Sequence, residues 1–385
     1  MNILFVSDSA DSGGAENQML EEIFILSGYI QICLITKKEP QANTILLLKN
    51  HSVIFLGTID DDITLINKID TFKFTFIHAH NIWDDKLLLF IKKINLPIVM
   101  TVHDYRILCP TGWKVQPNMV TECLQKNFNY CTTSICFENM YTVNTNASKS
   151  WFEKQYWLKK NVNGWAIVNN HLLNRMKEEG FENLHSVPYP MKKYPNYENR
   201  PRKFCIGYAG LLSEHKGIIR LISTIKSLSK INNNIEFIII GEGNMAGYLK
   251  EELSSFNNII YKGILSLSEI YSFFSICSVI YLPSKWQENF NLIGRYSRLI
   301  GTPILVPETG GFMQRLNCGI SEFYNPLKTN NDAIQLYEML KKVNKLNSGS
   351  ENDRIDEINQ SNVSNFLIKI SLLYASIGFK NIIKK

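Results

Sequence analysis

The sequence predicts an α/β protein built of two Rossmann-like domains, and three observations support this. Short apolar runs alternate with segments of helical spacing over residues 1–190, and the alternation restarts over residues 204–362. This order is typical of parallel sheets flanked by helices. Four prolines lie between His185 and Lys203, so we expect an interdomain linker at residues 191–203. A length of 385 residues suits two domains of ordinary size.

In the first half, each apolar run predicts a strand that ends in a polar loop, where open α/β sheets place their ligands. The predicted strands are Asn2–Val6, Ile30–Thr36, Ser52–Leu56, Phe74–His78, Ile98–His103 and Gly164–Val168. Helical spacing predicts helices over Ser148–Leu158, over His171–Glu179 and over Ala15–Ser27, the last with Met19, Leu20, Ile23, Phe24 and Leu26 on its apolar side. Residues at about 109–140 lack periodicity, and we expect an insertion or active-site lid there.

The second half repeats the alternation. Its predicted strands are Phe204–Ala209, Ile235–Gly241, Ile259–Lys262, Val279–Leu282 and Pro303–Val306, and its predicted helices include Ile218–Ser229, Met245–Leu253 and Leu267–Ser275. A last helix is predicted over Asn365–Ile377, with Gly378 suited to ending it. We expect residues 363–385 to pack back on the first domain.

Composition and charge limit the classes of function. The net charge of +6 and the pI near 8.7 fit ligands that carry phosphate, an anionic membrane surface, or an ordinary solvated surface. No cluster of Lys and Arg is interleaved with aromatic residues, so nucleic acid is not an expected partner. No apolar run approaches the roughly 18–20 residues that span a bilayer, and the N-terminus reads as a strand and not as a secretory signal. We therefore expect a cytoplasmic protein.

Polar motifs follow several strands of the first half. The run DSGGAE follows the first strand and opens a helix, where Gly13 and Gly14 allow a close approach of backbone to a phosphate, although a plain strand-to-helix turn would look the same. His103 ends another strand and could share a proton with Asp104. His78 also comes at the end of a strand, with His80 just beyond it.

Two motifs of the second half indicate an anion site. In GYAGLLSEHKG, Lys216 precedes a helix and can reach a diphosphate as a point charge. In the stretch from Pro283 to Gly311, a strand is followed by a short loop that carries Glu288 and by the start of a helix. A helix start offers backbone N–H donors to an anion.

In order and spacing, these motifs resemble the retaining GT-B glycosyltransferases of family 4. The resemblance extends from SGGAE through TVHDY, LCPTGW, GYAGLLSEHKG and IIIGEGN to PSKWQENFNLIG and ETGG, which is nearly the whole chain. It implies two facing Rossmann-like domains, with the active site in the interdomain cleft. It also implies retaining transfer of a hexose from a nucleotide-diphosphate sugar, UDP- or GDP-linked, without a metal. The implied acceptor is a glycan or a lipid-linked molecule at the inner membrane face, in surface polysaccharide biosynthesis of the O-antigen or capsule type, and the implied protein is peripheral on that membrane.

The resemblance also implies roles for residues. The implied catalytic residues are His103 beside the transferred sugar, Glu288 on the hydroxyls of the donor sugar and Lys216 at the diphosphate. The implied donor-binding residues are Gly13, Gly14, Glu16, Gly210, Lys216, Gly241, Gly263, Ile264, Glu288, Asn289, Phe290, Asn291, Leu292 and Tyr296. Of these, the resemblance puts Gly263 and Ile264 at the nucleobase and Tyr296 at the ribose. The implied acceptor side consists of His78, His80, Asp104 and Tyr105.

The chain departs from the family at three charged positions. Leu211 stands where the family has an arginine, Tyr296 where it has a second glutamate, and Gln314 where it has an acid. Arg220 and Lys203 are the nearest candidates to replace the missing arginine. The departures keep open a second hypothesis, a catalytically impaired GT-B protein that acts as a sugar-nucleotide-binding or regulatory subunit. A sugar-nucleotide epimerase on the same fold is a more distant third.

Cysteines raise one further question. Eight cysteines in a chain of this length do not indicate a disulfide framework. Cys109, Cys123, Cys131 and Cys136 are grouped in the insertion and could hold a structural zinc ion, or they could be free thiols.

Overall fold

The computed structural model describes residues 2–8, 14–38, 41–49, 52–59, 73–115, 122–124, 131, 145–191, 203–310, 312, 321–328, 331–345 and 362–379. The chain divides into two compact units. The first consists of Met1–Gly112, Gln125–Lys192 and Gln360–Lys385, and the second of Trp113–Leu124 and Lys193–Asn359. Part of the predicted insertion, Trp113–Leu124, thus groups with the second half of the chain.

In the first unit, the described strands form an eight-stranded sheet in the order β4-β3-β2-β1-β5-β6-β7-β8. The strands β2, β1, β5, β6, β7 and β8, which follow one another across the sheet, run parallel. The strand β3 pairs antiparallel with β2 on one side and with β4 on the other. The strands are β1 (Asn2–Ser7), β2 (Gln31–Lys38), β3 (Gln41–Lys49), β4 (Ser52–Ile59), β5 (Phe76–His80), β6 (Ile98–Val102), β7 (Val162–Ile167) and β8 (Leu184–Ser186).

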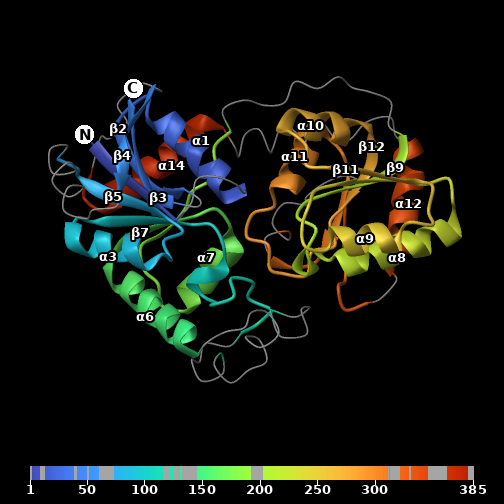
Figure 1. Ribbon diagram of the computed structural model, residues 1–385, viewed down its shortest axis with the longest axis horizontal. Coiled ribbons are helices and arrows are strands. Elements are labelled where there is room, and N and C mark those ends of the chain that lie inside the picture. Colours follow the sequence, from blue (N-terminus) through green and yellow to red (C-terminus); the bar gives the residue numbers. More distant parts are fainter. Residues whose placement is uncertain are drawn as a thin grey trace. The chain divides into compact units, whose positions relative to one another are not determined.

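The parity of the side chains along β1 divides the first unit into two cores. Ile3 and Phe5 face one core, which contains α1 (Gly14–Leu26) and α14 (Val363–Ser376). Leu4 and Val6 face the other, which contains α3 (Asp85–Ile94), α6 (Thr145–Asn161) and α7 (Asn170–Glu178). Figure 1 shows these two groups of helices on opposite faces of the sheet. Because side chains alternate along a strand, each buried strand supplies both cores.

In the second unit, the described strands form a six-stranded parallel sheet in the order β11-β10-β9-β12-β13-β14. The strands are β9 (Lys203–Ala209), β10 (Glu236–Ile240), β11 (Ile259–Gly263), β12 (Cys277–Tyr281), β13 (Ile304–Pro307) and β14 (Glu322–Tyr324). Counted from β9, this is the doubly wound order 3-2-1-4-5-6, and the strand order reverses between β9 and β12.

Helices cover both faces of the second sheet (Figure 1). One core contains α8 (Ile218–Ile231), α9 (Ala246–Glu252) and α12 (Asn331–Lys345). The helices α10 (Leu267–Ile276) and α11 (Leu292–Ile300) pack against each other, and α10 also contacts β9 and β12. Gly207 on β9 permits this, because an added Cβ would lie 2.6 Å from the Phe273 ring of α10. The prediction of two Rossmann-like α/β domains is confirmed.

Two details of the fold differ from the sequence prediction, one in the first sheet and one on α1. The first sheet is not wholly parallel, because β3 and β4 form an antiparallel hairpin with only Asn50 and His51 between them, and β3 was not predicted. On α1, Glu22 is buried and Leu20 is partly exposed, whereas Leu20 was predicted on the apolar side. At the end of the chain, α14 packs on β7 and β8 of the first unit, and Gly378 follows it with φ +99°. The domain boundaries drawn from the sequence stay a prediction, as does the active site between the domains.

Candidate active site

The site in the second unit is built from the loops that follow β9 and β12. In open parallel sheets, ligands bind outside the carboxyl ends of the strands at the point where the strand order reverses. Here that point carries the loop 210–217 and the loop 283–291. These are the two motifs that the sequence indicated as an anion site.

Glycine allows the two loops to approach each other. Gly217, with φ +78°, follows the short helix η2 (Glu214–Lys216), and a Cβ added to it would lie 1.8 Å from the carbonyl oxygen of Pro283. A side chain there would therefore collide with the backbone that leads to Glu288. Gly241, with φ +132°, stands as close to the carbonyl oxygen of Gly210. Backbone contact thus fixes the loops around the site.

A partly buried ion pair lies between the two loops. Lys216 Nζ donates to Glu288 Oε1 at 2.6 Å, and Ser284 Oγ donates to the same carboxylate oxygen at 2.9 Å. Glu288 is only 4% exposed. A carboxylate this deeply buried depends on its partners, because an unpaired charge in the interior is costly. The predicted residues Lys216 and Glu288 are therefore brought together in direct contact.

Aromatic rings surround this ion pair. Lys216 Nζ lies over the Trp286 ring, 4.5 Å from its centroid, and the His215 ring stacks on Trp113 with centroids 4.8 Å apart. His215 also meets the Trp286 ring edge-on. Burial, with a contribution from the charge of Lys216, lowers the pKa of His215 to about 4, so its imidazole is neutral at pH 7. Trp113, His215 and Trp286 were not predicted as site residues, although His215 and Trp286 lie within two residues of Lys216 and Glu288.

The start of α11 follows Glu288 directly. Asn291 caps the helix, because its Oδ1 accepts from the backbone N–H of Gly294 at 2.7 Å. Asn289 is buried, and Phe290 lies against the guanidinium of Arg295. The predicted donor-binding residues Glu288 to Leu292 therefore occupy a loop that leads into a capped helix N-terminus.

Tyr296, predicted to touch the ribose, lies within α11. Its side chain is buried and packs edge-on against the ring of Tyr271, with centroids 5.2 Å apart. Leu211, at the position of the missing arginine, is 51% exposed. Arg220 is engaged by Asp332 and by two backbone carbonyls, and Lys203 begins β9 at the end of the strand opposite to Gly210. Neither basic residue stands in for the arginine.

The third predicted segment of the second unit is the turn after β11. Gly263 has φ +65°, and its carbonyl oxygen accepts from the backbone N–H of Gly241 at 2.8 Å. Ile264 projects into solvent with 79% exposure. The turn therefore offers an accessible apolar side chain, at the place where the sequence resemblance put the nucleobase.

In the first unit, the predicted histidines belong to two buried hydrogen-bonded groups, and the rings of His78 and His80 lie next to each other with centroids 4.7 Å apart. His80 Nδ1 lies 2.8 Å from His103 Nε2, and His103 Nδ1 lies 2.6 Å from the Tyr189 hydroxyl. His78 bonds to Thr101 Oγ1 and to the Tyr374 hydroxyl, both at 2.8 Å. Burial lowers the pKa of His78 and His103 to about 3 and that of His80 well below its usual range, so these rings are neutral at pH 7.

Asp104 does not share a proton with His103, contrary to the hypothesis drawn from the sequence. Its carboxylate instead accepts from the backbone N–H of Arg106 at 2.8 Å and from the Arg106 side chain at 2.9 Å. An aspartate at the end of a strand and before a turn is well placed to accept a hydrogen bond from the backbone N–H two residues later in the chain. This explains why Asp104 bonds to Arg106 and not to His103. The hydroxyl of buried Tyr105 bonds to His171 Nδ1 at 2.8 Å.

The glycine loop of the first unit is described from Gly14, the first residue of α1, while Gly13 lies outside the described residues. Burial raises the pKa of Glu16. Asp8, which the sequence reasoning passed over, accepts from the backbone N–H groups of Trp83 and Asp84 at 2.7 and 3.1 Å, and burial raises its pKa to about 6. The position of Asp8 directly after the first strand is the feature of the sequence that could have identified it.

Two sequence predictions fall partly outside the described residues. Gln314 and Gly311 lie outside the described residues, as does Cys136 of the suggested zinc group. Of the remaining cysteines, Cys109 bonds to Thr111 at 3.2 Å and belongs to the first unit, whereas Cys123 belongs to the second. A zinc ion on the cysteines stays a prediction.

Comparisons with known proteins relate the chain to glycosyltransferases. Residues 192–348 match the model of the family described as glycosyl transferases group 1. The chain is 26% identical over 137 residues to the lipopolysaccharide 1,2-N-acetylglucosaminetransferase of Salmonella typhimurium, covering 33% of this chain and 36% of that protein. It is 22% identical over 286 residues to an uncharacterized 41.2 kDa protein in the cps region of Klebsiella pneumoniae, covering 72% of each. The chain therefore spans about a third of the Salmonella protein.

Solved structures share the whole architecture. Anabaena HepE, solved with UDP and glucose, has a TM-score of 0.66 at 16% identity over 98% of this chain and 100% of its own. Sucrose-phosphate synthase of Thermosynechococcus elongatus has a TM-score of 0.70 at 12% identity, over 98% and 99%. These likenesses show the two-domain GT-B fold. Together with the family match, they support a glycosyltransferase. In the part of the chain that the structure describes, no helix is both long and apolar enough to span a membrane.

Proposed function

We propose that the chain is a retaining glycosyltransferase of the family 4 type that transfers a hexose from a UDP- or GDP-linked donor. The observation that carries the proposal is the pair of buried Glu288 and partly exposed Lys216 at the carboxyl ends of β9 and β12, with Lys216 Nζ 2.6 Å from Glu288 Oε1. A carboxylate can accept from sugar hydroxyls, and an ammonium group can neutralise a diphosphate. The two groups that a nucleotide-sugar donor requires thus lie side by side, inside the segment that matches the family.

Without a donor, these two groups neutralise each other. Donor binding is proposed to exchange this contact for two new ones, with the diphosphate on Lys216 and the sugar hydroxyls on Glu288. The N-terminus of α11, which follows in the chain, adds the positive end of a helix dipole. In this scheme the protein provides no nucleophile. Instead, the leaving diphosphate helps to activate the acceptor, and rate comes from positioning and from stabilised phosphate charge, without a metal at the diphosphate.

His103 is proposed to act beside the transferred sugar. Both of its ring nitrogens are occupied, Nε2 by His80 and Nδ1 by Tyr189. Contact with the sugar therefore requires that one of these hydrogen bonds be exchanged. The proposed acceptor side includes His78, His80, Asp104 and Tyr105.

The acceptor is proposed to be a glycan or a lipid-linked precursor of a surface polysaccharide. The names of the Salmonella and Klebsiella relatives, one a lipopolysaccharide transferase and one from a cps region, support this class. The net charge of +6 would favour peripheral contact with an anionic inner membrane face.

A catalytically impaired protein that binds sugar nucleotides or regulates a partner is the second candidate. It is favoured by the uncharged, exposed Leu211 and by the burial of Tyr296 against Tyr271. One cation would then face a diphosphate where the family has two. This would weaken stabilisation of the leaving group more than it would weaken binding.

The test has two parts. A panel of nucleotide sugars is first screened by thermal shift, since a ligand that binds the folded protein raises its melting temperature. Transfer of the selected sugar to membrane and glycan extracts is then measured for the wild type and for Glu288→Ala. We expect Glu288→Ala to abolish transfer while nucleotide affinity stays within a few fold. Transfer that persists in the variant contradicts the role of Glu288, and donor binding without turnover of any acceptor supports the second candidate.

A further inference from the structure

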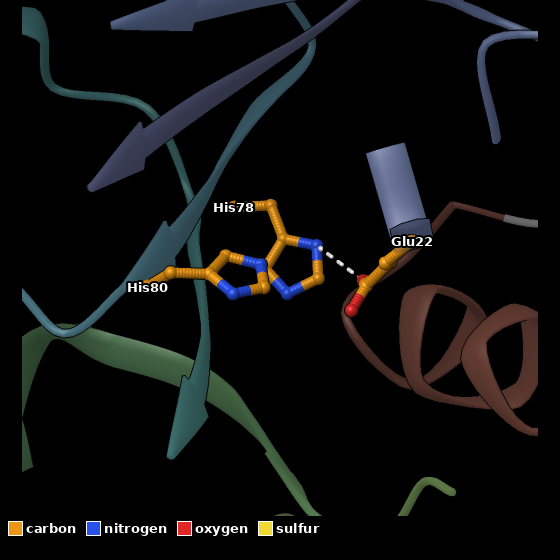
Figure 2. A group of neighbouring side chains, drawn as sticks. All are labelled: Glu22, His78 and His80. Carbon is orange, nitrogen blue, oxygen red and sulfur yellow. Dashed lines mark ion pairs between the residues drawn. The ribbon is translucent and has the colours of Figure 1, made fainter. Parts of the chain in front are cut away.

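A second group of functional side chains is buried in the first unit, whereas the residues of the proposed donor site belong to the second. Glu22 on α1 and His78 and His80 on β5 meet under α1 and α14, and each is at most 3% exposed. Figure 2 shows a ring nitrogen of His78 directed at the Glu22 carboxylate, with the His80 ring beside it. His78 Nδ1 lies 3.6 Å from Glu22 Oε1, and one donor atom from each residue lies within 4.8 Å of the other two.

Two polar atoms of this group have no hydrogen-bond partner among the described residues. Glu22 Oε1 and His80 Nε2 are both buried and accept or donate no hydrogen bond. Leaving a buried polar atom unsatisfied costs about 1–3 kcal/mol. Two such atoms in one cluster therefore indicate that something absent from a bare polypeptide occupies the space between them.

The hydrogen bonds around the cluster fix the tautomers of His78 and His80 so that one nitrogen of each ring can bind a cation. His78 Nε2 can donate to Thr101 Oγ1, and His80 Nδ1 can donate to His103 Nε2, each at 2.8 Å. In these tautomers His78 Nδ1 and His80 Nε2 carry the lone pairs, and that of His78 Nδ1 accepts from the Tyr374 hydroxyl in the ion-free protein. His78 Nδ1 lies 3.6 Å from Glu22 Oε1. Histidines that ligate metals almost always donate their other N–H to such an outer partner, which fixes the ring and raises its basicity.

We propose that Glu22, His78 Nδ1 and His80 Nε2 bind one divalent transition-metal ion of the zinc class. Ligand bonds of about 2.0–2.1 Å in a tetrahedron place the donor atoms about 3.4 Å apart, close to the 3.6 Å between Glu22 and His78. The Tyr374 hydroxyl, 2.8 Å from His78 Nδ1, marks the neighbouring fourth position and must release that nitrogen when the ion binds. Two imidazoles and one carboxylate suit Zn²⁺ or Co²⁺ better than Mg²⁺ or Ca²⁺.

The ion would be structural. It would join α1 to the middle of the first sheet and would give a partner to Glu22 Oε1, which makes no hydrogen bond among the described residues. It would also hold His80, and through it the ring of His103. The proposal does not rest on the glycosyltransferase activity, because bound metal is measured without a donor or an acceptor, and the family match begins at residue 192. His78 and His80 also belong to the proposed acceptor side, and with the ion in place they would act there by positioning and not by contact with the acceptor.

The experiment measures bound metal directly. Because the site is closed, the protein is loaded by two routes: expression in medium supplemented with Zn²⁺, and refolding from denaturant with Co²⁺. We expect about one ion per chain by elemental analysis, a tetrahedral Co²⁺ absorption spectrum without thiolate charge-transfer bands, and a melting temperature that rises on loading. Thiolate bands would instead place the ion on cysteines.

Variants locate the ion. Glu22→Gln keeps the shape of the side chain and removes the charge, so metal affinity should fall at least tenfold, since even outer partners contribute about 10–100-fold. Thr101→Val leaves the three proposed ligands in place and removes the partner of His78 Nε2, so it serves if Glu22→Gln does not fold. We expect it to weaken metal binding by about tenfold. His185→Asn, which changes a histidine of β8 outside the cluster, should retain the ion.

Three results would overturn the proposal. The first is folded wild-type protein without metal after both loading routes, in which case a water molecule would be the simpler occupant. The second is metal that stays at full stoichiometry in Glu22→Gln. The third is a Co²⁺ spectrum dominated by thiolate that is lost in Cys109→Ser.

Discussion

Replacing Lys216 by methionine removes the only charged partner that the described residues place against buried Glu288. Methionine preserves most of the aliphatic stem and deletes the ammonium group, whose nitrogen lies over the Trp286 ring. Breaking a buried ion pair by removing one member costs about 3–5 kcal/mol. Lys216 is 24% exposed, so the lower figure of about 3 kcal/mol applies. For a domain of this size, about 2–4 °C of melting temperature is lost per kcal/mol, so we expect a fall of about 6–12 °C.

Scanning calorimetry of the ligand-free protein measures this fall, and two further variants sharpen it. Lys285→Met removes the neighbouring lysine, whose partner Glu214 is 59% exposed at 3.4 Å, so it should cost at most about 1 kcal/mol. The double variant Lys216→Met/Glu288→Gln removes both charges and should recover about 1–3 kcal/mol relative to additivity. If Lys216→Met costs no more than Lys285→Met, and the double variant is additive, the pair does not form in solution.

Three other changes have distinct expected outcomes. Gly217→Ala should destabilise the protein by at least about 2 kcal/mol in urea unfolding, because φ is +78° and the added Cβ would collide with the backbone of Pro283. The control Gly247→Ala, where an added Cβ has nothing within 4 Å, should be neutral or stabilising by up to about 1 kcal/mol. His215 has a pKa of about 4 when folded and about 6.5 when unfolded, so the unfolded state takes up the proton first and stability falls as the pH drops through this interval. His215→Asn should show a smaller fall of melting temperature between pH 7 and pH 4, and an equal fall would refute the assignment. Tyr296→Phe should weaken nucleotide binding by about 3–10-fold in calorimetry if its hydroxyl contacts the ribose, and unchanged affinity would exclude that contact.

The fold was predictable because most of its strands are buried on both faces and read as short apolar runs. The hairpin of β3 and β4 was harder, since QANTILLLK and SVIFLGTI form one apolar region interrupted by only two residues. Nothing in the pattern of that region distinguishes a further strand from the helix that a βαβ unit would place there. The two-residue connection decides that β3 and β4 pair antiparallel. The composition of the region does not reveal where this connection lies.

The proposed donor site was predictable in its charged residues and not in their surroundings. Glu288 and Lys216 lie in local motifs, and their places in the chain order identify them. Trp113, which stacks on His215, comes from a segment about a hundred residues earlier without periodicity, so only the folded chain brings it to the second unit. Glu22 was missed for a different reason. A carboxylate among apolar residues on a helix is ordinarily assigned to the exposed face, and its burial depends on partners from β5.

The central claim, that the loops after β9 and β12 bind the diphosphate of a nucleotide sugar, is tested most directly by titration calorimetry with UDP and with GDP. The wild type is compared with Lys216→Met, and Lys285→Met serves as the control. We predict that one of the two nucleotides binds the wild type, and that Lys216→Met weakens this binding by about tenfold or more, corresponding to about 1.4 kcal/mol. Absence of binding by either nucleotide, or equal affinity in Lys216→Met, would contradict the claim.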